Sequence, residues 1–366
     1  MVFYYGSTSA VAWLFLLAYW IAALIVAAYL YARWNWRGLR GRVAVRSAER
    51  GPDSPVDDLP EQLVRSGPIP VPIFEGDRVE IELAFDTNGG PRGPARLSGS
   101  VAGAALSAAT GLVPRGGWQG QRTVGPVARG PLDATAWVLE AADPLGLFKR
   151  KRRTQDAEMA LALPRFTSMV ARREVHESEA SVAAPRAGTG TELFGVREYR
   201  PGDPLRRIHW RSSARHGELI VREYEPPGVQ TLAIICDPRP PTAEVADQVA
   251  RLAASEAWDC IRDGGRVVLS APGLEPSRPE ESRSLWALLE WLARYPSPGT
   301  GEGWRRGSDL QPVGDAVAIF ASSSPAIAET LESVRSRGGS VRAWVVGDAE
   351  VDVDGPTTRV GTSWPL

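Results

Sequence analysis

The hydrophobic pattern begins with one long uncharged run. Residues 1–32 carry no formally charged side chain, and residues 10–31 are the apolar centre of this run. About 20 apolar residues suffice for a helix to cross a bilayer. Tyrosines and tryptophans gather largely toward the two ends of the run, as they do at membrane interfaces. The sequence therefore predicts one transmembrane helix, with residues 10–31 in contact with the lipid bilayer.

A cluster of arginines follows this run directly: Arg33, Arg37, Arg40, Arg42 and Arg46. Positive charge beside a membrane helix favours the cytoplasmic side. A cleaved signal peptide is disfavoured, because a basic segment before the run and a clear small-residue cleavage site are both missing. We expect a single-pass protein of the inner (cytoplasmic) membrane, with its N-terminus outside and its main body in the cytoplasm. Residues 1–50 are assigned to the anchor and its basic flank.

The pattern then changes to the two-residue period of β-strands. Proline and glycine are dense over residues 51–72, which predicts a linker. Residues 78–85 alternate between apolar and polar side chains, as in a half-buried antiparallel strand. Clusters of turn-forming residues separate further short runs, and this spacing predicts an all-β sandwich of immunoglobulin or fibronectin-like type over residues 73–165. The basic run 149–153 is expected to be a solvated loop.

In the last third of the chain, continuous apolar runs alternate with helical patterns. The expected strands are 231–236, 266–270, 316–321 and 341–346, and the expected helices are 243–261, 282–292 and 325–337. Strands that are apolar throughout are buried on both faces, which is typical of a parallel sheet covered by helices. The sequence therefore predicts a multidomain protein with an α/β domain over residues 229–366.

Composition adds few constraints on chemistry. The chain has 366 residues and a formal net charge of −1, so no overall positive field favours nucleic acid. Cys236 and Cys260 lie in apolar patterns and make neither a disulfide framework nor a zinc site. The three histidines show no metal-ligand spacing. We expect no cofactor.

The most specific segment covers residues 195–225 and reads GVREYRPGDPLRRIHWRSSARHGELIVREYE. Asp203 followed by Pro204 is a typical helix start, because aspartate caps free backbone N–H groups and proline suits the first helical position. A helix over 204–215 and a strand over 218–224 are predicted. The resulting hairpin region is assigned to residues 166–228.

This segment resembles the signature of the bacterial family catalogued as domain of unknown function 58, an REYxPGDxxRxIxWxxxAR core followed by a GxLxVREYE-like strand. A shorter match, at residues 143–148, is similar to the DPxGLF turn of the same family. The candidate interaction residues are taken from this signature and from the arginines beside its matched positions: Arg197, Glu198, Tyr199, Pro201, Gly202, Asp203, Arg206, Arg207, His209, Trp210, Arg211, Arg215, Arg222, Glu223 and Tyr224.

The resemblance also implies a C-terminal region similar to the von Willebrand factor type A fold. Such domains hold Mg²⁺ with an Asp-x-Ser-x-Ser motif after the first strand. Here Asp237 stands in the aspartate position, but Arg239 and Pro241 replace the two serines. Asp237 is therefore interpreted as the remnant of a metal site, paired with Arg239 or capping the next helix, and no metal is expected.

Arg207, Arg211 and Arg215 recur every four residues and would form one stripe on the predicted helix. We weigh three roles for the stripe: a network with neighbouring acids, a docking surface for a protein, and a phosphate-binding surface. Glu198, Asp203 and other interleaved acids would cancel much of the local field, which disfavours nucleic acid.

No catalytic motif is recognisable, so an enzyme is not expected. Members of the resembled family are commonly associated with MoxR-type AAA+ ATPases. The resemblance therefore implies a membrane-anchored cytoplasmic adaptor or scaffold that works with such an ATPase in cell-envelope or protein-complex assembly. The alternatives are an enzyme that processes cell-envelope precursors and, less favoured, a phosphate- or nucleic-acid-binding protein.

Overall fold

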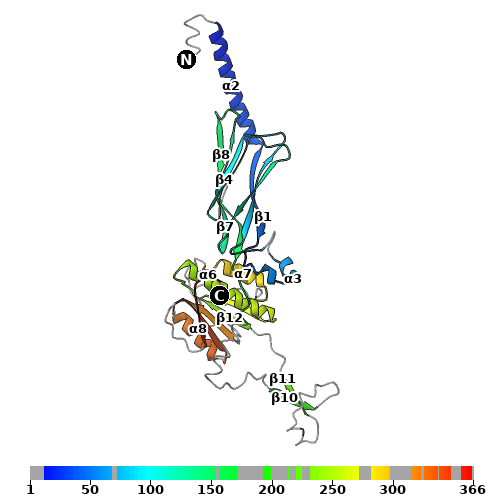
Figure 1. Cartoon of the computed structure of the whole chain (residues 1–366), viewed down its shortest axis with the longest axis vertical. Helices are drawn as coiled ribbons and strands as arrows, with labels where there is room; N and C mark the ends of the chain where they lie inside the picture. The colour runs from blue at the N-terminus through cyan, green and yellow to red at the C-terminus, as the bar shows by residue number, and fades with distance from the viewer. Residues whose placement is uncertain are drawn as a thin grey trace. The chain divides into compact units, whose positions relative to one another are not determined.

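The computed structural model divides the chain into two compact units. Unit 1 contains Met1–Arg165 and Leu289–Tyr295, and unit 2 contains Phe166–Leu288 and Pro296–Leu366 (Figure 1). The structure describes residues 12–67, 72–153, 156–170, 193–198, 213, 220–224, 231–271, 282–296, 315–322, 325–336, 338–347 and 356–364. For 193–198 and 220–224 the description is of the backbone.

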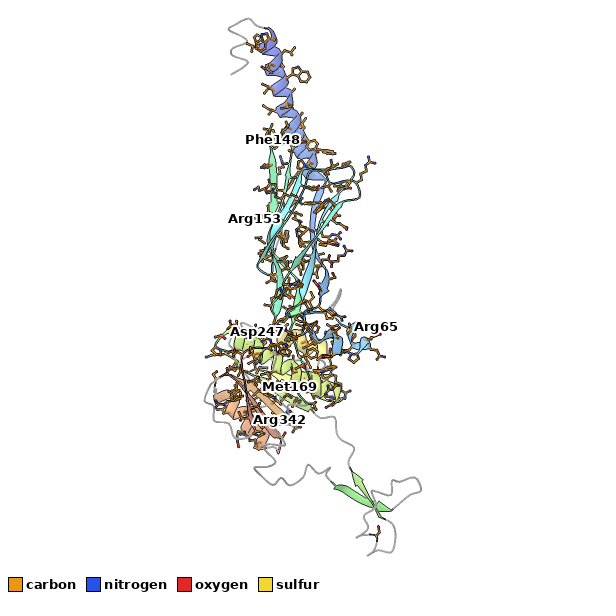
Figure 2. The ribbon with its side chains drawn as sticks, viewed as in Figure 1. Arg65, Phe148, Arg153, Met169, Asp247 and Arg342 are labelled. Carbon is orange, nitrogen blue, oxygen red and sulfur yellow. The ribbon has the colours of Figure 1, made fainter. Side chains whose placement is uncertain are left out.

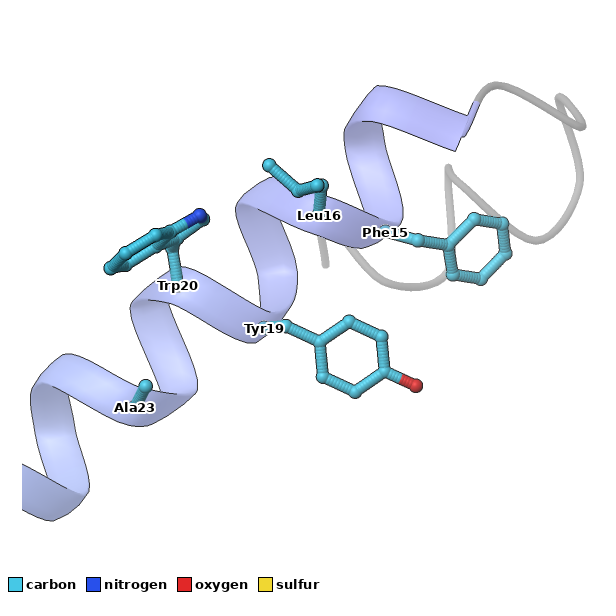
Figure 3. Close-up of a pocket in the computed structure, with 5 residues that line it drawn as sticks. All are labelled: Phe15, Leu16, Tyr19, Trp20 and Ala23. Atoms are coloured by element: carbon cyan, nitrogen blue, oxygen red, sulfur yellow. The ribbon is translucent and has the colours of Figure 1, made fainter.

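Unit 1 begins with one long helix, α2 (Ala12–Arg37). The stretch Trp13–Arg37 has a mean hydropathy of 2.2 in its most apolar window, and only 6% of that window is buried. It is long and apolar enough to cross a membrane, which agrees with the expected anchor. Figure 3 shows Phe15, Leu16, Tyr19 and Trp20 projecting outward from the helix.

The β-rich part of unit 1 begins earlier than the sequence suggested. Strand β1 (Leu39–Glu49) follows α2 directly and pairs antiparallel with β3 (Arg78–Thr87). The segment that we assigned to the anchor's basic flank is thus largely a strand. The arginines of β1 make its two-residue alternation hard to recognise in the sequence. Arg42 and Arg46 lie on the exposed side and face Glu82 on β3 at 3.8 and 3.9 Å.

The expected linker is also more structured than predicted. It contains a 3₁₀ helix, η1 (Pro55–Asp58), and a short helix, α3 (Glu61–Arg65). Proline at the start of η1 and a buried Val56 explain why a proline-rich stretch is ordered here. The remaining strands of unit 1 are β2 (Ile73–Phe74), β4 (Ala95–Val101), β5 (Ala104–Thr110), β6 (Trp118–Val124), β7 (Gly130–Ala142), β8 (Lys149–Arg153) and β9 (Ala157–Leu163).

Two sheets make up the β-rich part. One has the order β1-β3-β6, and the other has the order β2-β9-β7-β4-β5 with β8 paired to β7. The basic run expected to be a loop is therefore β8, and Lys151 lies 3.2 Å from Glu140 on β7. Cross-strand pairs of opposite charge favour this arrangement.

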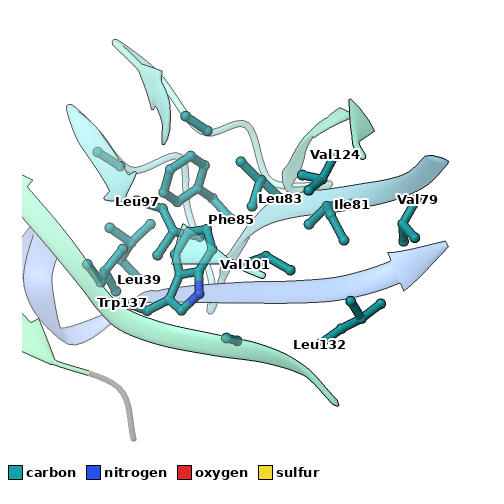
Figure 4. Close-up of a cluster of buried hydrophobic side chains, with 14 of the residues drawn as sticks. Leu39, Val79, Ile81, Leu83, Phe85, Leu97, Val101, Val124, Leu132 and Trp137 are labelled. Atoms are coloured by element: carbon teal, nitrogen blue, oxygen red, sulfur yellow. The ribbon is translucent and has the colours of Figure 1, made fainter. Parts of the chain in front are cut away.

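The inner faces of the two sheets share one hydrophobic core (Figure 4). Ile81, Leu83 and Phe85 on β3 are fully buried, as the alternation over 78–85 predicts. Trp137 on β7 is 3% exposed and packs across Gly99 of β4, where a Cβ atom would stand 2.4 Å from the indole ring. The glycine thus makes room for the largest side chain of the core.

Unit 2 is built on a parallel sheet, as the continuous apolar runs predict. Its strands are β12 (Thr231–Cys236), β13 (Arg266–Ser270), β14 (Asp315–Phe320), β15 (Ser340–Val346) and β16 (Thr357–Val360), in the order β13-β12-β14-β15-β16. All four pairings are parallel. Its helices are α6 (Ala243–Arg262), α8 (Pro325–Arg335) and the first residues of α7 (Leu285–Ala293).

The helices of unit 2 pack on the sheet and bury side chains of its strands. Ile327, Leu331 and Val334 of α8 share a core with Ile235 and Phe320 of the sheet. Helix α6, capped by Thr242, carries fourteen buried residues and contacts four of the strands. The coarse architecture of one apolar helix, a β-rich region and an α/β region is therefore as predicted.

Candidate functional site

The signature segment contains an antiparallel strand pair. Strand β10 (Leu193–Glu198) pairs with β11 (Ile220–Tyr224), so that Val196 faces Arg222 and Arg197 faces Val221. β11 fits the predicted strand over 218–224, whereas β10 was not predicted. The pair brings two Arg-Glu pairs of the signature segment, at 197–198 and 222–223, onto neighbouring strands.

The other candidate interaction residues lie outside the described residues. These are Tyr199, Pro201, Gly202, Asp203, Arg206, Arg207, His209, Trp210, Arg211 and Arg215. Within the predicted helix 204–215 the structure describes Ser213, which is helical and buried. The arginine stripe therefore stays a prediction.

The carboxyl ends of β12 and β14 form the topological switch point of the parallel sheet. Here the connections from neighbouring strands lead in opposite directions, which is where open α/β sheets bind ligands. Asp237 follows β12 at this edge and is 1% exposed. The sequence therefore placed its one candidate metal ligand at the correct edge of the sheet.

The Asp237 carboxylate accepts hydrogen bonds from three backbone N–H groups. One oxygen accepts from Arg239 N at 2.9 Å, and the other accepts from Ala321 N at 3.0 Å and Ser322 N at 3.2 Å. The Ser322 hydroxyl lies 3.2 Å from the second oxygen as well. Hydrogen bonds from several donors fix the orientation of this carboxylate.

This geometry corrects the expected partners of Asp237. The backbone N–H of Arg239 donates to Asp237, and helix α6 is capped not by Asp237 but by Thr242, which accepts from Val245 N. The residues here fit a magnesium site poorly, because Arg239 and Pro241 stand where hydroxyl ligands are needed and backbone N–H groups already donate to both carboxylate oxygens. Among the described residues no group of three or more His, Cys, Asp and Glu side chains could hold a metal.

A buried polar row on α6 was missed by the sequence reasoning. Asp259 is fully buried and accepts from Met169 N at 2.8 Å and from the Ser168 hydroxyl at 2.9 Å. The Ser255 hydroxyl accepts from Thr167 N at 3.1 Å. These bonds fix residues 166–169, the start of unit 2, along the helix (Figure 2). An acid and a serine on the apolar face of the predicted helix were the available signal.

Glu256 is the second buried acid of α6. One of its oxygens accepts from the Trp344 indole N–H at 2.9 Å, and the other lies 3.5 Å from the Arg342 guanidinium. Both partners come from β15, so the pair of bonds joins α6 to the sheet. Glu256 and Asp259 of this helix therefore join it to β15 and to residues 168–169.

Comparison with known proteins gives one family and one relative. The family model "Protein of unknown function DUF58" matches residues 195–281, which include β10, β11, β12, α6 and β13. The chain is 28% identical over 101 residues to "Uncharacterized protein YeaD" of Bacillus subtilis (strain 168). That alignment covers 28% of this chain and 22% of the relative. No solved structure matches.

The family match covers the arginine-rich signature and the switch-point aspartate together. It agrees with the resemblance drawn from the REY, PGD and VREYE elements of the sequence. Residues 195–281 of this chain therefore match the DUF58 family.

Proposed function

We propose that this protein is a membrane-anchored interaction protein, an adaptor or scaffold whose DUF58 region presents a docking surface at the cytoplasmic face of the inner membrane. The observation that carries the proposal is the state of Asp237. At the sheet edge where a ligand would bind, its carboxylate is engaged by the backbone of Arg239, Ala321 and Ser322. That arrangement favours a rigid surface over a catalytic centre.

The anchor supports this proposal. Helix α2 leads into β1 with one residue between them, and Asn35 of the helix bonds to backbone groups beside β4 and at the end of β7. These bonds fix the β-rich body of unit 1 to the anchor. The five arginines from Arg33 to Arg46 favour the cytoplasmic side for that body.

We further infer the finer fold assignments. The two sheets of unit 1 are taken as an immunoglobulin or fibronectin-like sandwich, and the unit 2 sheet as a degenerate von Willebrand type A-like domain. The all-parallel sheet with an aspartate after β12 supports the second assignment. In this assignment Asp237 keeps the position of a metal ligand and serves as a clamp between loops.

The proposed partner is a MoxR-type AAA+ ATPase, and the arginine stripe Arg207, Arg211 and Arg215 is the proposed contact. Guanidinium groups bind carboxylates with two parallel hydrogen bonds, so a stripe of three suits an acidic protein surface. Arginine is also enriched among residues that dominate interface energies.

The test is co-purification of the full chain from solubilised membranes under ATP-trapping conditions. The wild-type chain is expected to recover an AAA+ ATPase, and the triple variant Arg207→Ala, Arg211→Ala, Arg215→Ala is expected to lose it. A matched control replaces three exposed arginines of unit 1, Arg115, Arg122 and Arg153, with alanine and retains the partner.

Two outcomes of the co-purification would change the proposal. Absence of any AAA+ protein from the wild-type sample contradicts the adaptor proposal. Recovery by both triple variants keeps the adaptor and shows that the stripe is not its contact.

A further inference from the structure

One end of unit 1, where α2 meets the sheets, exposes leucines. Leu145 and Leu147 are 56% and 55% exposed, and both lie in the six-residue turn 143–148 between β7 and β8. Leu112, at the neighbouring connection between β5 and β6, is 60% exposed. Single exposed leucines are ordinary, but two in one short turn beside a membrane helix are not.

The turn is held rigidly with its leucines outward. Asp143 is 1% exposed, and its two carboxylate oxygens accept from Leu145 N at 2.9 Å and Phe148 N at 2.6 Å. Gly146 has a φ of +71°, a conformation that favours glycine. The carboxylate thus closes the turn from inside, so that Leu145 and Leu147 do not fold back into the core.

The same turn is attached to α2. The rings of Tyr29 and Phe148 meet edge to face with their centres 5.6 Å apart, and Asn35 donates to Ala142 O at 2.9 Å. In Figure 2, Phe148 lies at the end of the sheets from which α2 departs. The depth of Tyr29 in a bilayer therefore sets the depth of the turn.

That depth follows from the length of the apolar helix. A span of about 20 residues, counted back from the first charged residue Arg33, takes in residues 13–32. Tyr29 lies four residues before Arg33, which is about 6 Å along a helix. Ala28 and Ala32 are 6% and 2% exposed, so the last turns of the span are already covered on one side. The turn that touches Tyr29 lies at the headgroup level.

The charges around the turn suit an anionic lipid surface. Lys149, Arg150 and Lys151 follow it directly, and Arg96 and Lys149 line a groove of about 490 Å³ beside it. Glu140, which faces Lys149 and Lys151 at 4.0 and 3.2 Å, also lines the groove. Basic residues next to a membrane helix are drawn to phospholipid phosphates.

We propose that the turn 143–148 is a second membrane contact of this protein. Leu145 and Leu147 enter the boundary between headgroups and acyl chains, while Lys149, Arg150 and Arg96 bind phospholipid phosphates. Leu112 extends the same surface. The contact fixes the orientation of unit 1 against the bilayer, which a single helix leaves free to rotate. It depends on α2 crossing the membrane, and it is independent of any ATPase partner.

The test uses the full chain in phospholipid vesicles with a polarity-sensitive fluorophore on single cysteines. The probes are placed by Leu145→Cys and Leu147→Cys in a Cys260→Ser background, in which Cys236 stays buried. Ala102→Cys is the matched control, because Ala102 is exposed in the hairpin at the opposite end of β4 from the turn. Trp20→Cys reports α2 itself.

Probes at Leu145 and Leu147 are expected to be blue-shifted, quenched by lipid-borne nitroxide, and several-fold less accessible to aqueous iodide than the probe at Ala102. Adding phosphatidylglycerol to phosphatidylcholine vesicles is expected to strengthen this protection from iodide. The double variant Lys149→Gln, Arg150→Gln is expected to lose the extra protection that phosphatidylglycerol gives. The proposal is overturned if iodide reaches Leu145 and Leu147 as freely as Ala102 while the Trp20 probe is quenched by lipid. Protection from iodide without nitroxide quenching also overturns it, since protein then covers the turn.

Discussion

The Asp237 carboxylate and the backbone N–H of Ala321 are joined by a hydrogen bond of 3.0 Å. The two residues are 84 positions apart and follow the neighbouring strands β12 and β14. Asp237 N also donates to Ile319 O at 2.9 Å, so the pairing of the strands continues one step past their ends. A buried charge therefore closes the sheet edge at its switch point.

Replacing this carboxylate should destabilise unit 2. Asp237→Ala removes the acceptor of three N–H groups, of which that of Ala321 is buried and those of Arg239 and Ser322 are part-buried, and we expect a loss of about 2 kcal/mol in the free energy of unfolding. Asp237→Asn should cost nearly as much, because its NH₂ group would face donors. Urea unfolding of the full chain measures the loss. Asp263→Asn, an exposed aspartate of the same unit, is the control and should stay within about 0.5 kcal/mol of wild type.

A second prediction concerns the binding of Mg²⁺ at Asp237. If Asp237 is a clamp, Mg²⁺ has no site to occupy, so millimolar Mg²⁺ should not shift the unfolding transition of unit 2 or change the hydrogen exchange of the Ala321 and Ser322 amides. A stabilisation by Mg²⁺ that Asp237→Asn abolishes would contradict this interpretation, because ligand binding to the native state raises its stability.

The core of unit 1 is closely packed around Gly99. A Cβ atom there would lie 2.4 Å from the buried Trp137 ring, which is too close for both to keep their positions. Gly99→Ala should therefore lower the stability of unit 1 by about 2 kcal/mol through overpacking. Gly111→Ala is the matched control, since nothing lies within 4 Å of its added Cβ. Equal melting temperatures for the two variants would show that the Trp137 side chain adjusts easily to an added methyl group.

The sequence predicts unit 2 more closely than unit 1, for a physical reason. β12 and β13 occupy the predicted ranges 231–236 and 266–270, and α6 ends one residue later than predicted. Strands buried on both faces and a helix with one apolar face have strong, unbroken periods. In β1 the period is carried by Leu39, Val43 and Val45 alone, and arginines between them suggest a juxtamembrane segment.

The contacts of Asp237 at the switch point could not be predicted from the sequence, for a different reason. The sequence places Asp237 after the first strand of the sheet, but it does not reveal that Ala321 and Ser322 donate to it, because those contacts depend on how two loops meet. The same holds for Asp259, whose partners Ser168 and Met169 are about 90 residues away along the chain. Backbone donors carry no side-chain signature, so their pairing with a buried acid is invisible to pattern reading.

An ion pair in unit 1 makes its stability depend on pH. Arg294 bonds both oxygens of Glu158, at 2.8 and 2.6 Å, and this lowers the pKa of Glu158 below its ordinary value near 4.5. A carboxylate with a lowered pKa in the folded state adds stability above its unfolded pKa, and that contribution disappears as the pH falls through the folded value.

Glu158→Gln should therefore be less stable than wild type at pH 7 by at most about 0.5 kcal/mol, since both side chains are well exposed and solvent screens the pair. The difference should vanish at acidic pH, where Glu158 is itself neutral. Thermal unfolding of both proteins from acidic pH to pH 7 measures the difference in stability, and high salt should reduce this difference at pH 7. A difference that persists unchanged in acid would show that packing, not charge, is responsible.

The join between α2 and the sheets depends on Asn35, which is fully buried. Its amide donates to Ala142 O at 2.9 Å and Pro94 O at 3.3 Å, and its oxygen accepts from Gly93 N at 2.9 Å. Asn35→Ala would remove these three bonds, although Pro94 O keeps its bond from Ala142 N at 3.2 Å, and the change should cost about 2 kcal/mol. Tyr31→Phe removes one bond of 2.7 Å to Gly93 O and should cost about 1 kcal/mol.

The two variants can be separated by hydrogen exchange of the full chain in detergent micelles. Asn35→Ala should raise the exchange rate of the Gly93 amide and expose the turn 143–148 to protease, because the helix no longer holds it. Tyr31→Phe should leave the Gly93 amide protected, since Asn35 still accepts from it. If Asn35→Ala behaves no worse than Tyr31→Phe, the helix is attached mainly by its aromatic contacts, with the Tyr29 and Phe148 ring pair as the next residues to test.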